Sequence, residues 1–177
     1  MLNVYDIKRN KNLNFILPLK DIVKADLYSL RTSVLIVIHL FYIEKVEGYL
    51  KYIRDIPNDI DILFVTSSNQ VKAKVSDYMD ALNKKYRVIE KENRGRDVSA
   101  FLVACSMEIL NYKYVCFLHD KREKSEFTKK DTQIFERCLW ENMIGSGAYI
   151  TNIIRKFDDN PELGLLFPPE SVSDNFS

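Results

Sequence analysis

Short apolar runs alternate along the chain with longer stretches of helical periodicity, and this alternation restricts the possible fold more than any other feature. Four runs are rich in β-branched and aromatic residues: 33–42, 59–68, 86–92 and 112–120. Continuous runs of this kind are typical of strands buried on both faces of a sheet. Between them, apolar residues recur every three or four positions, as on one face of a helix, over 43–56, 70–85 and 97–110.

Strands that alternate with helices of this length predict β-α-β units and an α/β fold. Because right-handed crossovers place helices on both faces of the sheet, we expect three α/β/α layers around a mostly parallel sheet. Helical patterns continue at 132–144 and 148–159, and the run at 162–169 predicts a last strand that its prolines end.

The length and composition favour one domain. The chain has 177 residues, of which 46% are hydrophobic, and this is enough for a sizeable core. We expect an N-terminal segment of undefined structure at 1–32, a folded domain at 33–169 and a polar tail at 170–177. That tail is either a frayed terminus or the point where this chain stops inside a longer protein.

Charge and cysteine content exclude several classes of protein. A net charge of +1 argues against binding of nucleic acid, so any anion site is local. Cys105, Cys116 and Cys138 are odd in number and widely spaced, which indicates reduced thiols of a cytoplasmic protein rather than disulfides or a zinc site. No signal peptide and no run long enough to cross a bilayer is evident.

Polar side chains gather where the predicted strands end. They are His39 and Tyr42; Thr66, Ser67, Ser68 and Asn69; Asn93, Arg94, Gly95, Arg96 and Asp97; and His119, Asp120 and Lys121. The carboxyl ends of parallel strands meet at one edge of a sheet, and ligands bind in the crevice beyond that edge. The sequence therefore predicts a ligand site at this edge. His39, inside an apolar run, is expected in the core or on the crevice floor.

The stretch "ENRGRDVS" at 92–99 is suited to a phosphate group. Gly95 allows a positive φ angle or close approach of the backbone, and the guanidinium groups of Arg94 and Arg96 can hold phosphate bidentately. A helix that begins near Asp97 would add the partial positive charge of its amino end. Asp97 itself could cap that helix, hold an arginine or accept from a sugar hydroxyl. The alternative is an ordinary surface corner with an Arg–Asp ion pair.

The stretch "FLHDKRE" at 117–123 carries a second set of candidate groups. Asp120 could hold a divalent ion together with substrate phosphates, and His119 could be a ligand or a base. Lys121 could instead stabilise a departing phosphate without a metal. The alternatives are a hydrogen-bonded histidine at a strand end and a solvated charged loop.

Several of these segments together resemble the rhamnan synthesis F family of bacterial cell-surface polysaccharide synthesis. The segments are "VLIVIHLFY", "DIDILFVTSSN", "ENRGRDVSAFL", "YVCFLHDKREK", a helix bearing Trp140, and "NPELGLLFPP", and the resemblance covers about residues 30–170. Members are taken to be rhamnosyltransferases, and the family looks like an outlying branch of the GT-A glycosyltransferases. In common inverting members of that fold, an N-x-G motif lines the nucleotide site and a D-x-D motif ends the fourth strand.

The resemblance implies a nucleotide-sugar site, and it gives each candidate a role. The nucleotide sugar would be held by Thr66, Ser67, Asn93, Arg94, Gly95, Arg96 and Asp97, with the catalytic set His119, Asp120 and Lys121 at the diphosphate. The implied donor is dTDP-rhamnose or a related nucleotide sugar, and the acceptor is a glycan or lipid-linked glycan. The implied location is the cytoplasm, with peripheral contact at the inner face of the membrane.

This sequence departs from the GT-A pattern because it has one carboxylate where D-x-D has two. Either Asp120 binds Mg²⁺ or Mn²⁺ with help from His119 or Glu123, or Lys121 takes over the electrostatic role of the metal. The general base for the acceptor hydroxyl is expected after the fourth strand, and the candidates are Asp131, Glu136 and Glu141.

Two other readings of the chain stay open. The missing second carboxylate and the short acceptor region favour a non-catalytic or truncated GT-A-like module that serves as a binding scaffold in a polysaccharide assembly. A phosphatase-like domain would need a nucleophilic aspartate at the end of the first strand, and residues 38–42, "IHLFY", contain none.

Overall fold

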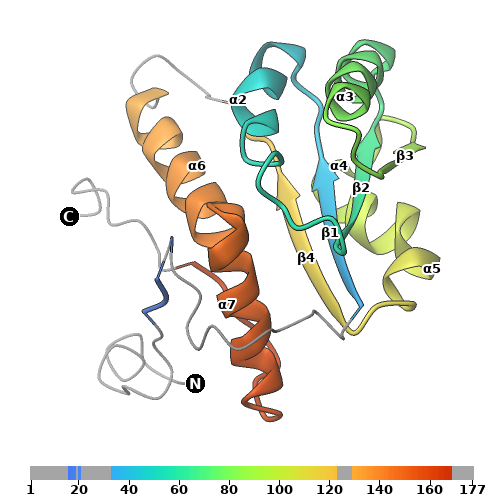
Figure 1. Cartoon of the computed structure of the whole chain (residues 1–177). Helices are drawn as coiled ribbons and strands as arrows, with labels where there is room; N and C mark the ends of the chain where they lie inside the picture. Colours follow the sequence, from blue (N-terminus) through green and yellow to red (C-terminus); the bar gives the residue numbers. More distant parts are fainter. Residues whose placement is uncertain (1–15, 19, 21–32, 123–128, 169–177) are drawn as a thin grey trace, which may run out of the picture.

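The protein is an α/β domain built on a four-stranded, fully parallel sheet (Figure 1). The computed structural model describes residues 16–18, 20, 33–122 and 129–168. The strands are β1 (Val34–His39), β2 (Asp61–Thr66), β3 (Arg87–Glu90) and β4 (Tyr114–His119), in the order β3-β2-β1-β4. All four coincide with the predicted apolar runs, which confirms the parallel sheet.

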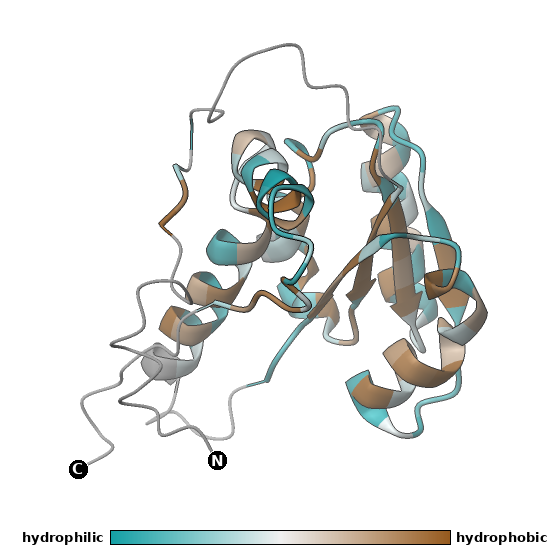
Figure 2. Cartoon of the chain, turned by 90° about the horizontal axis from the view of Figure 1, so that it is seen from below, coloured by the Kyte–Doolittle hydropathy of each residue, from teal (hydrophilic) through white to brown (hydrophobic). Residues whose placement is uncertain are grey.

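Helices cover both faces of the sheet, as the crossover rule requires. One face packs against η2 (Ile43–Lys45), α2 (Val46–Leu50), α3 (Asn69–Ala81), α6 (Lys129–Ile144) and α7 (Gly147–Asp158). The other face packs against α4 (Arg96–Ser99), η3 (Ala100–Ala104) and α5 (Ser106–Ile109). The predicted three-layer α/β/α arrangement is thereby confirmed, and Figure 2 shows α4–η3–α5 on the side of the sheet away from α6 and α7.

The central strand explains the continuous apolar runs. Every residue of β1 is buried, with Ile36 and Ile38 in the core beneath α2, α3, α6 and α7. Leu35 and Val37 lie in the smaller core beneath α4, η3 and α5. A strand with helices on both faces needs apolar side chains at successive positions, which is why the sequence does not alternate here.

The prediction of a single helix over 97–110 is wrong. The segment consists of α4, a π-helical turn η3 and α5. Ala100 and Cys105 are both completely buried against the sheet. Their five-residue spacing matches the i→i+5 hydrogen-bond pattern of a π turn. Asp97 does not cap this segment either, since Gly95 occupies the position before the first turn.

The predicted strand at 162–169 is also wrong over its described part, 162–168, which contains no strand. The N–H of Leu163 donates to the carbonyl of Asn160 at 2.9 Å, so the chain turns here instead of extending. Leu165 and Phe167 are 71% and 73% exposed, so their side chains do not pack as they would in a buried strand.

The described parts of the two chain ends are small. From the N-terminal segment, the carbonyl of Pro18 accepts a hydrogen bond from Nδ2 of Asn152 on α7 at 3.0 Å. The polar tail at 170–177 lies outside the described residues. Within the described part of the chain, every helix is too short or too polar to cross a membrane.

Two glycines give a matched test of the packing between α7 and the loop after α2. A Cβ atom at Gly147 would lie 2.5 Å from the backbone oxygen of Asp55, whereas one at Gly48 would meet nothing within 4 Å. We expect Gly147→Ala to lower the free energy of unfolding by about 1–3 kcal/mol, because two backbone segments must move apart. Gly48→Ala should leave it unchanged or raise it by up to about 1 kcal/mol. Urea denaturation measures both, and equal effects would contradict the assigned contact.

Candidate functional site

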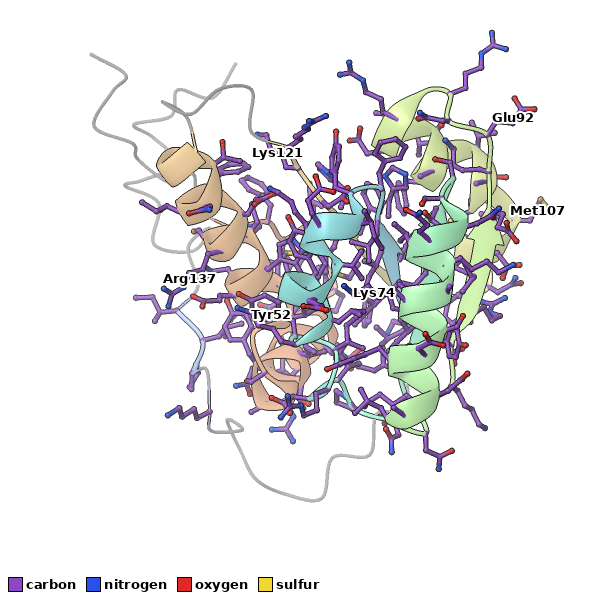
Figure 3. All side chains as sticks on the ribbon, turned by 90° about the horizontal axis from the view of Figure 1, so that it is seen from above. Tyr52, Lys74, Glu92, Met107, Lys121 and Arg137 are labelled. Carbon is purple, nitrogen blue, oxygen red and sulfur yellow. The ribbon has the colours of Figure 1, made fainter. Side chains whose placement is uncertain are left out.

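An open cleft of about 560 Å³ lies beyond the carboxyl ends of the strands. It is lined by Phe41, Tyr42, Ile43, Glu44, Ser67, Ser68, Gln70, Asn93 and Arg122. These residues come from the segments that follow β1, β2, β3 and β4, so all four strand ends contribute to one site. The volume is in the range of pockets for small molecules and cofactors. In Figure 3, which looks down on the molecule, Lys121 and Glu92 lie on opposite sides of this edge.

Aromatic and cationic groups meet on one wall of the cleft. The rings of Phe41 and Tyr42 contact each other edge to face, with centroids 5.1 Å apart. The guanidinium carbon of Arg122 lies 5.8 Å from the centroid of the Tyr42 ring. Aromatic faces beside a guanidinium group are suited to a flat ring that carries an anionic substituent.

A second part of the cleft lining comes from the amino end of α3 and the turn before it. Ser68 is the N-cap of this helix, and its Oγ accepts from the N–H of Val71 at 3.3 Å. The hydroxyl of Thr66 accepts from the N–H of Ser68 at 3.1 Å, which fixes the turn between strand and helix. The first turn of α3, which includes Gln70, therefore directs the positive end of the helix dipole at the cleft.

The corner at 91–96 is held by its own backbone. Gly95 has φ 74° and Arg96 has φ 52°, so two consecutive residues are in the left-handed region. Nζ of Lys91 donates to the carbonyls of Glu92 and Arg94, at 2.7 and 2.9 Å. A side chain at position 95 would collide with Ser99, whose Cβ lies 2.6 Å from the ideal Cβ position. The positive φ expected of this glycine is confirmed.

Asp120 is buried and joins two strand ends. Its Oδ2 accepts the N–H groups of Phe41 and Tyr42, both at 2.7 Å, and its own N–H donates to the carbonyl of His39 at 3.1 Å. Only 6% of the residue is exposed. Burial raises the pKa of this carboxyl, while the two backbone N–H groups act in the opposite direction. The carboxylate thus holds the backbone of the aromatic wall.

Glu136 on α6 is the second buried acid near this edge. Nζ of Lys45 lies 3.0 Å from both of its carboxylate oxygens, and the Tyr49 hydroxyl donates to Oε1 at 2.5 Å. The backbone N–H of Lys121 also donates to Oε1, at 3.0 Å. Burial, followed by the bond to Glu136, raises the pKa of Tyr49 above its usual range. With these partners, Glu136 positions the segment after β4 rather than facing an acceptor.

The two histidines pair in register on neighbouring strands, under α4. His39 and His119 are partners in the β1–β4 ladder. Nδ1 of His119 lies 2.9 Å from the carbonyl of Asp120, and its Nε2 lies 3.8 Å from Oδ2 of Asp97. Burial first, and then the charges of Lys91 and His119, lower the pKa of His39 to about 4. His39 is therefore neutral near pH 7 and lies on the floor of this edge, where it was expected.

The predicted site residues fall into four groups. Ser67 and Asn93 line the cleft. Asp97 and His119 lie close to each other but outside the cleft lining, and Thr66 and Asp120 are buried. Arg94, Gly95, Arg96 and Lys121 are exposed and lie outside the cleft lining, with Nζ of Lys121 over the Phe135 ring at 4.3 Å.

Sequence reasoning did not select Phe41, Glu44, Gln70 or Arg122 for the site. Phe41 reads as part of the first apolar run, and Arg122 reads as one charge in a solvated loop. The order of the sheet is what brings these residues together.

The acids near this edge do not form a metal site within the described residues. No group of three His, Cys, Asp or Glu side chains in this part of the chain is arranged to hold a metal ion. Asp120 uses Oδ2 for two backbone N–H groups, and Glu123 lies outside the described residues.

The three predicted bases also differ in surroundings. Glu136 is engaged as described, and Glu141 pairs with Arg137 one helical turn away, Nε to Oε1 at 2.8 Å. The side chain of Asp131 lies outside the described residues. Glu44 is the carboxylate that lines the cleft.

Comparison with known families assigns the chain. The family model described as rhamnan synthesis protein F matches residues 1–177. The chain belongs to the rhamnan synthesis protein F family. This membership implies that the protein takes part in the synthesis of rhamnan polysaccharide. Comparisons with curated proteins and with solved structures gave no match.

The role of Asp120 in this rhamnan synthesis F protein can be tested by two substitutions. Asp120→Ala should lower the free energy of unfolding by about 2–4 kcal/mol, because two backbone N–H groups lose a charged acceptor. Asp120→Asn should cost less, since its carbonyl oxygen can still accept from both N–H groups. Urea denaturation at neutral pH compares the two variants. Equal losses would contradict the acceptor role of Oδ2.

The lowered pKa of His39 predicts a pH dependence of stability. Between the ordinary pKa of 6.5 and about 4, the unfolded chain binds more protons at this position than the folded chain does. The free energy of unfolding should therefore fall as the pH falls through this range, by up to about 3 kcal/mol from this group. His39→Gln should remove that part of the dependence. Urea denaturation of both proteins from pH 7 to pH 4 measures the difference, and identical profiles would contradict the assignment.

Proposed function

We propose that this protein is a GT-A-like glycosyltransferase that transfers rhamnose from a nucleotide-diphosphate sugar, dTDP-rhamnose, to a glycan or lipid-linked acceptor at the inner face of the membrane. The observation that carries the proposal is the cleft at the carboxyl edge of the sheet, in which two aromatic rings, an arginine and a helix amino end surround one space. Membership of the rhamnan synthesis protein F family supports this choice of sugar.

The two parts of the cleft lining suit the two ends of a nucleotide diphosphate. The base would stack on Phe41 or Tyr42, where an aromatic face offers area without requiring a specific hydrogen bond. Asn93 and Ser67 would hydrogen-bond the sugar of the nucleotide. The diphosphate would then lie between Arg122 and the first turn of α3, both of which are positive.

The chemistry follows from charge that develops on the leaving group. The bond between the anomeric carbon and the diphosphate oxygen breaks, its electron pair stays on the nucleoside diphosphate, and the acceptor oxygen bonds to the anomeric carbon. Fixed positive charge at the diphosphate stabilises the transition state more than the ground state, which is the condition for catalysis. Arg122 supplies that charge in the cleft, and Lys121, Arg94 and Arg96 are the neighbouring cations that can add to it.

The acceptor hydroxyl must lose a proton as it attacks. Glu44 is placed to receive this proton, because it lines the cleft and is exposed at its rim. Glu44→Gln should therefore lower kcat for transfer while leaving the affinity for the donor nucleotide nearly unchanged.

The non-catalytic scaffold is the second candidate, and one observation favours it. Asp120, the predicted catalytic acid, and Glu136, one of the three candidate bases, both hold backbone groups. A scaffold that retains the cleft but not the chemistry could bind the nucleotide diphosphate, but it would show no transfer.

Ligand-induced stabilisation tests the donor site. At about ten times its Kd, dTDP or dTDP-rhamnose should raise the melting temperature by about 3–6 °C. Arg122→Ala should weaken binding about tenfold or more, because a charged hydrogen-bond donor to phosphate is lost. Arg96→Ala in the same assay tests the predicted contribution of the 93–97 corner. Addition of EDTA or Mn²⁺ tests the requirement for a metal.

Arg137→Ala is the matched control, since this exposed arginine on α6 pairs with Glu141 and does not line the cleft. No stabilisation of the wild-type protein by any nucleoside diphosphate, with or without a divalent metal, would rule out the donor site. Binding without release of nucleoside diphosphate in the presence of a rhamnan acceptor would favour the scaffold.

A further inference from the structure

The outer face of the α4–η3–α5 layer exposes an unusual number of large apolar side chains. They are Val98, Leu102, Val103, Met107 and Leu110, each between 59% and 76% exposed. Figure 3 shows Met107 at the outer limit of this layer, directed away from the sheet. We call these five residues the outer apolar face. An exposed apolar cluster of this size on a soluble domain marks a surface that contacts another apolar body.

The π turn keeps the outer apolar face continuous. In a regular helix, the buried positions Ala100 and Cys105 would drift around the axis, because five residues exceed one α-helical turn. The wider turn of η3 returns Cys105 to the sheet, so the residues between and after these positions keep their outward direction. The layer is therefore apolar on its sheet side and on its outer side.

Charge is confined to the ends of this layer. The ten residues 98–107 contain no charged side chain, and Glu108 on α5 pairs with Arg87. At the other end, Arg94 and Arg96 are exposed, and within the described residues neither forms an ion pair with a carboxylate. The layer thus presents an apolar surface with two arginines at one end. Such a surface is complementary to a partner that has an apolar interior and a negatively charged border.

We propose that the outer apolar face binds the surface of an anionic lipid bilayer. Its five side chains enter the boundary between headgroups and acyl chains, as the apolar side of an interfacial helix does, and Arg94 and Arg96 contact the lipid phosphates. This orientation places α4–η3–α5 on the membrane and leaves α6 and α7 facing away from it (Figure 2). The inference stands on this surface alone and does not depend on the chemistry proposed for the cleft.

Flotation with vesicles tests the proposal on the full chain. The protein should bind vesicles of equal parts phosphatidylcholine and phosphatidylglycerol, and bind pure phosphatidylcholine vesicles about tenfold more weakly or less. Raising the salt concentration should reduce binding to the anionic vesicles, because the arginine contribution is screened. Val103→Glu with Met107→Glu should lower binding about tenfold or more.

Three further variants separate the apolar contribution to vesicle binding from the electrostatic contribution. Val103→Ser with Met107→Ser removes apolar area without adding charge, and it should also weaken binding. Arg94→Glu with Arg96→Glu should abolish the preference for anionic lipid. Ile134→Glu on α6 is the matched control, since Ile134 is an exposed apolar residue, at 53%, outside the outer apolar face. It should bind vesicles as the wild type does, and melting temperatures establish that each variant is folded.

Three outcomes would overturn the proposal. The first is that the wild-type protein fails to float with anionic vesicles. The second is that the glutamate pair and Ile134→Glu reduce flotation equally. The third is a self-association, measured by analytical ultracentrifugation, that the glutamate and serine pairs abolish while vesicle binding is unaffected. That result would assign the outer apolar face to a second copy of the chain. None of these outcomes alters the expectation that dTDP or dTDP-rhamnose stabilises the protein, so membrane binding and donor binding are tested separately.

Discussion

The carboxylate of Asp120 is the contact on which the carboxyl edge of this domain depends. By accepting two backbone N–H groups from the segment after β1, it fixes the end of β4 against the aromatic wall of the cleft. Glu136 adds a second connection, from α6 to the backbone of Lys121 and to the ammonium of Lys45. Asp120, predicted as a catalytic group, and Glu136, one of three candidate bases, are thus acids that hold the backbone around the site. The polar and aromatic groups that line the cleft are aromatic, hydroxyl, amide and guanidinium groups together with one carboxylate, that of Glu44.

Position in the sheet, rather than distance along the chain, decides which side chains share the cleft. In the order β3-β2-β1-β4, the first strand lies between the second and the fourth, so the segments after these strands converge. Short connections leave little freedom to the residues directly after each strand. Phe41 and Ser67 lie within two residues of the ends of β1 and β2, and Arg122 comes from the segment after β4.

The sequence was most informative where burial alone dictates the residue type. The apolar runs predicted all four strands, their parallel direction and the edge that carries polar groups, because strands covered on both faces cannot hide polar side chains. It was least informative where tertiary contacts choose between local alternatives. The sequence of 97–110 does not indicate a π turn. The turn arises because Ala100 and Cys105 both pack against the sheet. Likewise, the sequence does not distinguish an aspartate that acts in catalysis from one that accepts hydrogen bonds from the backbone, as Asp120 does.

The π turn also determines where this layer can change length. Removing one residue between Ala100 and Cys105 would leave these two side chains four positions apart, on the same face of an ordinary α-helix. Both would still pack against the sheet, and Met107 would keep its outward direction. A residue removed from α5 has no such compensation, because it rotates the helix that follows by about 100° about its axis. A single-residue deletion is therefore tolerable inside the π turn, whereas beside the turn it would exchange the inside of the layer for its outside.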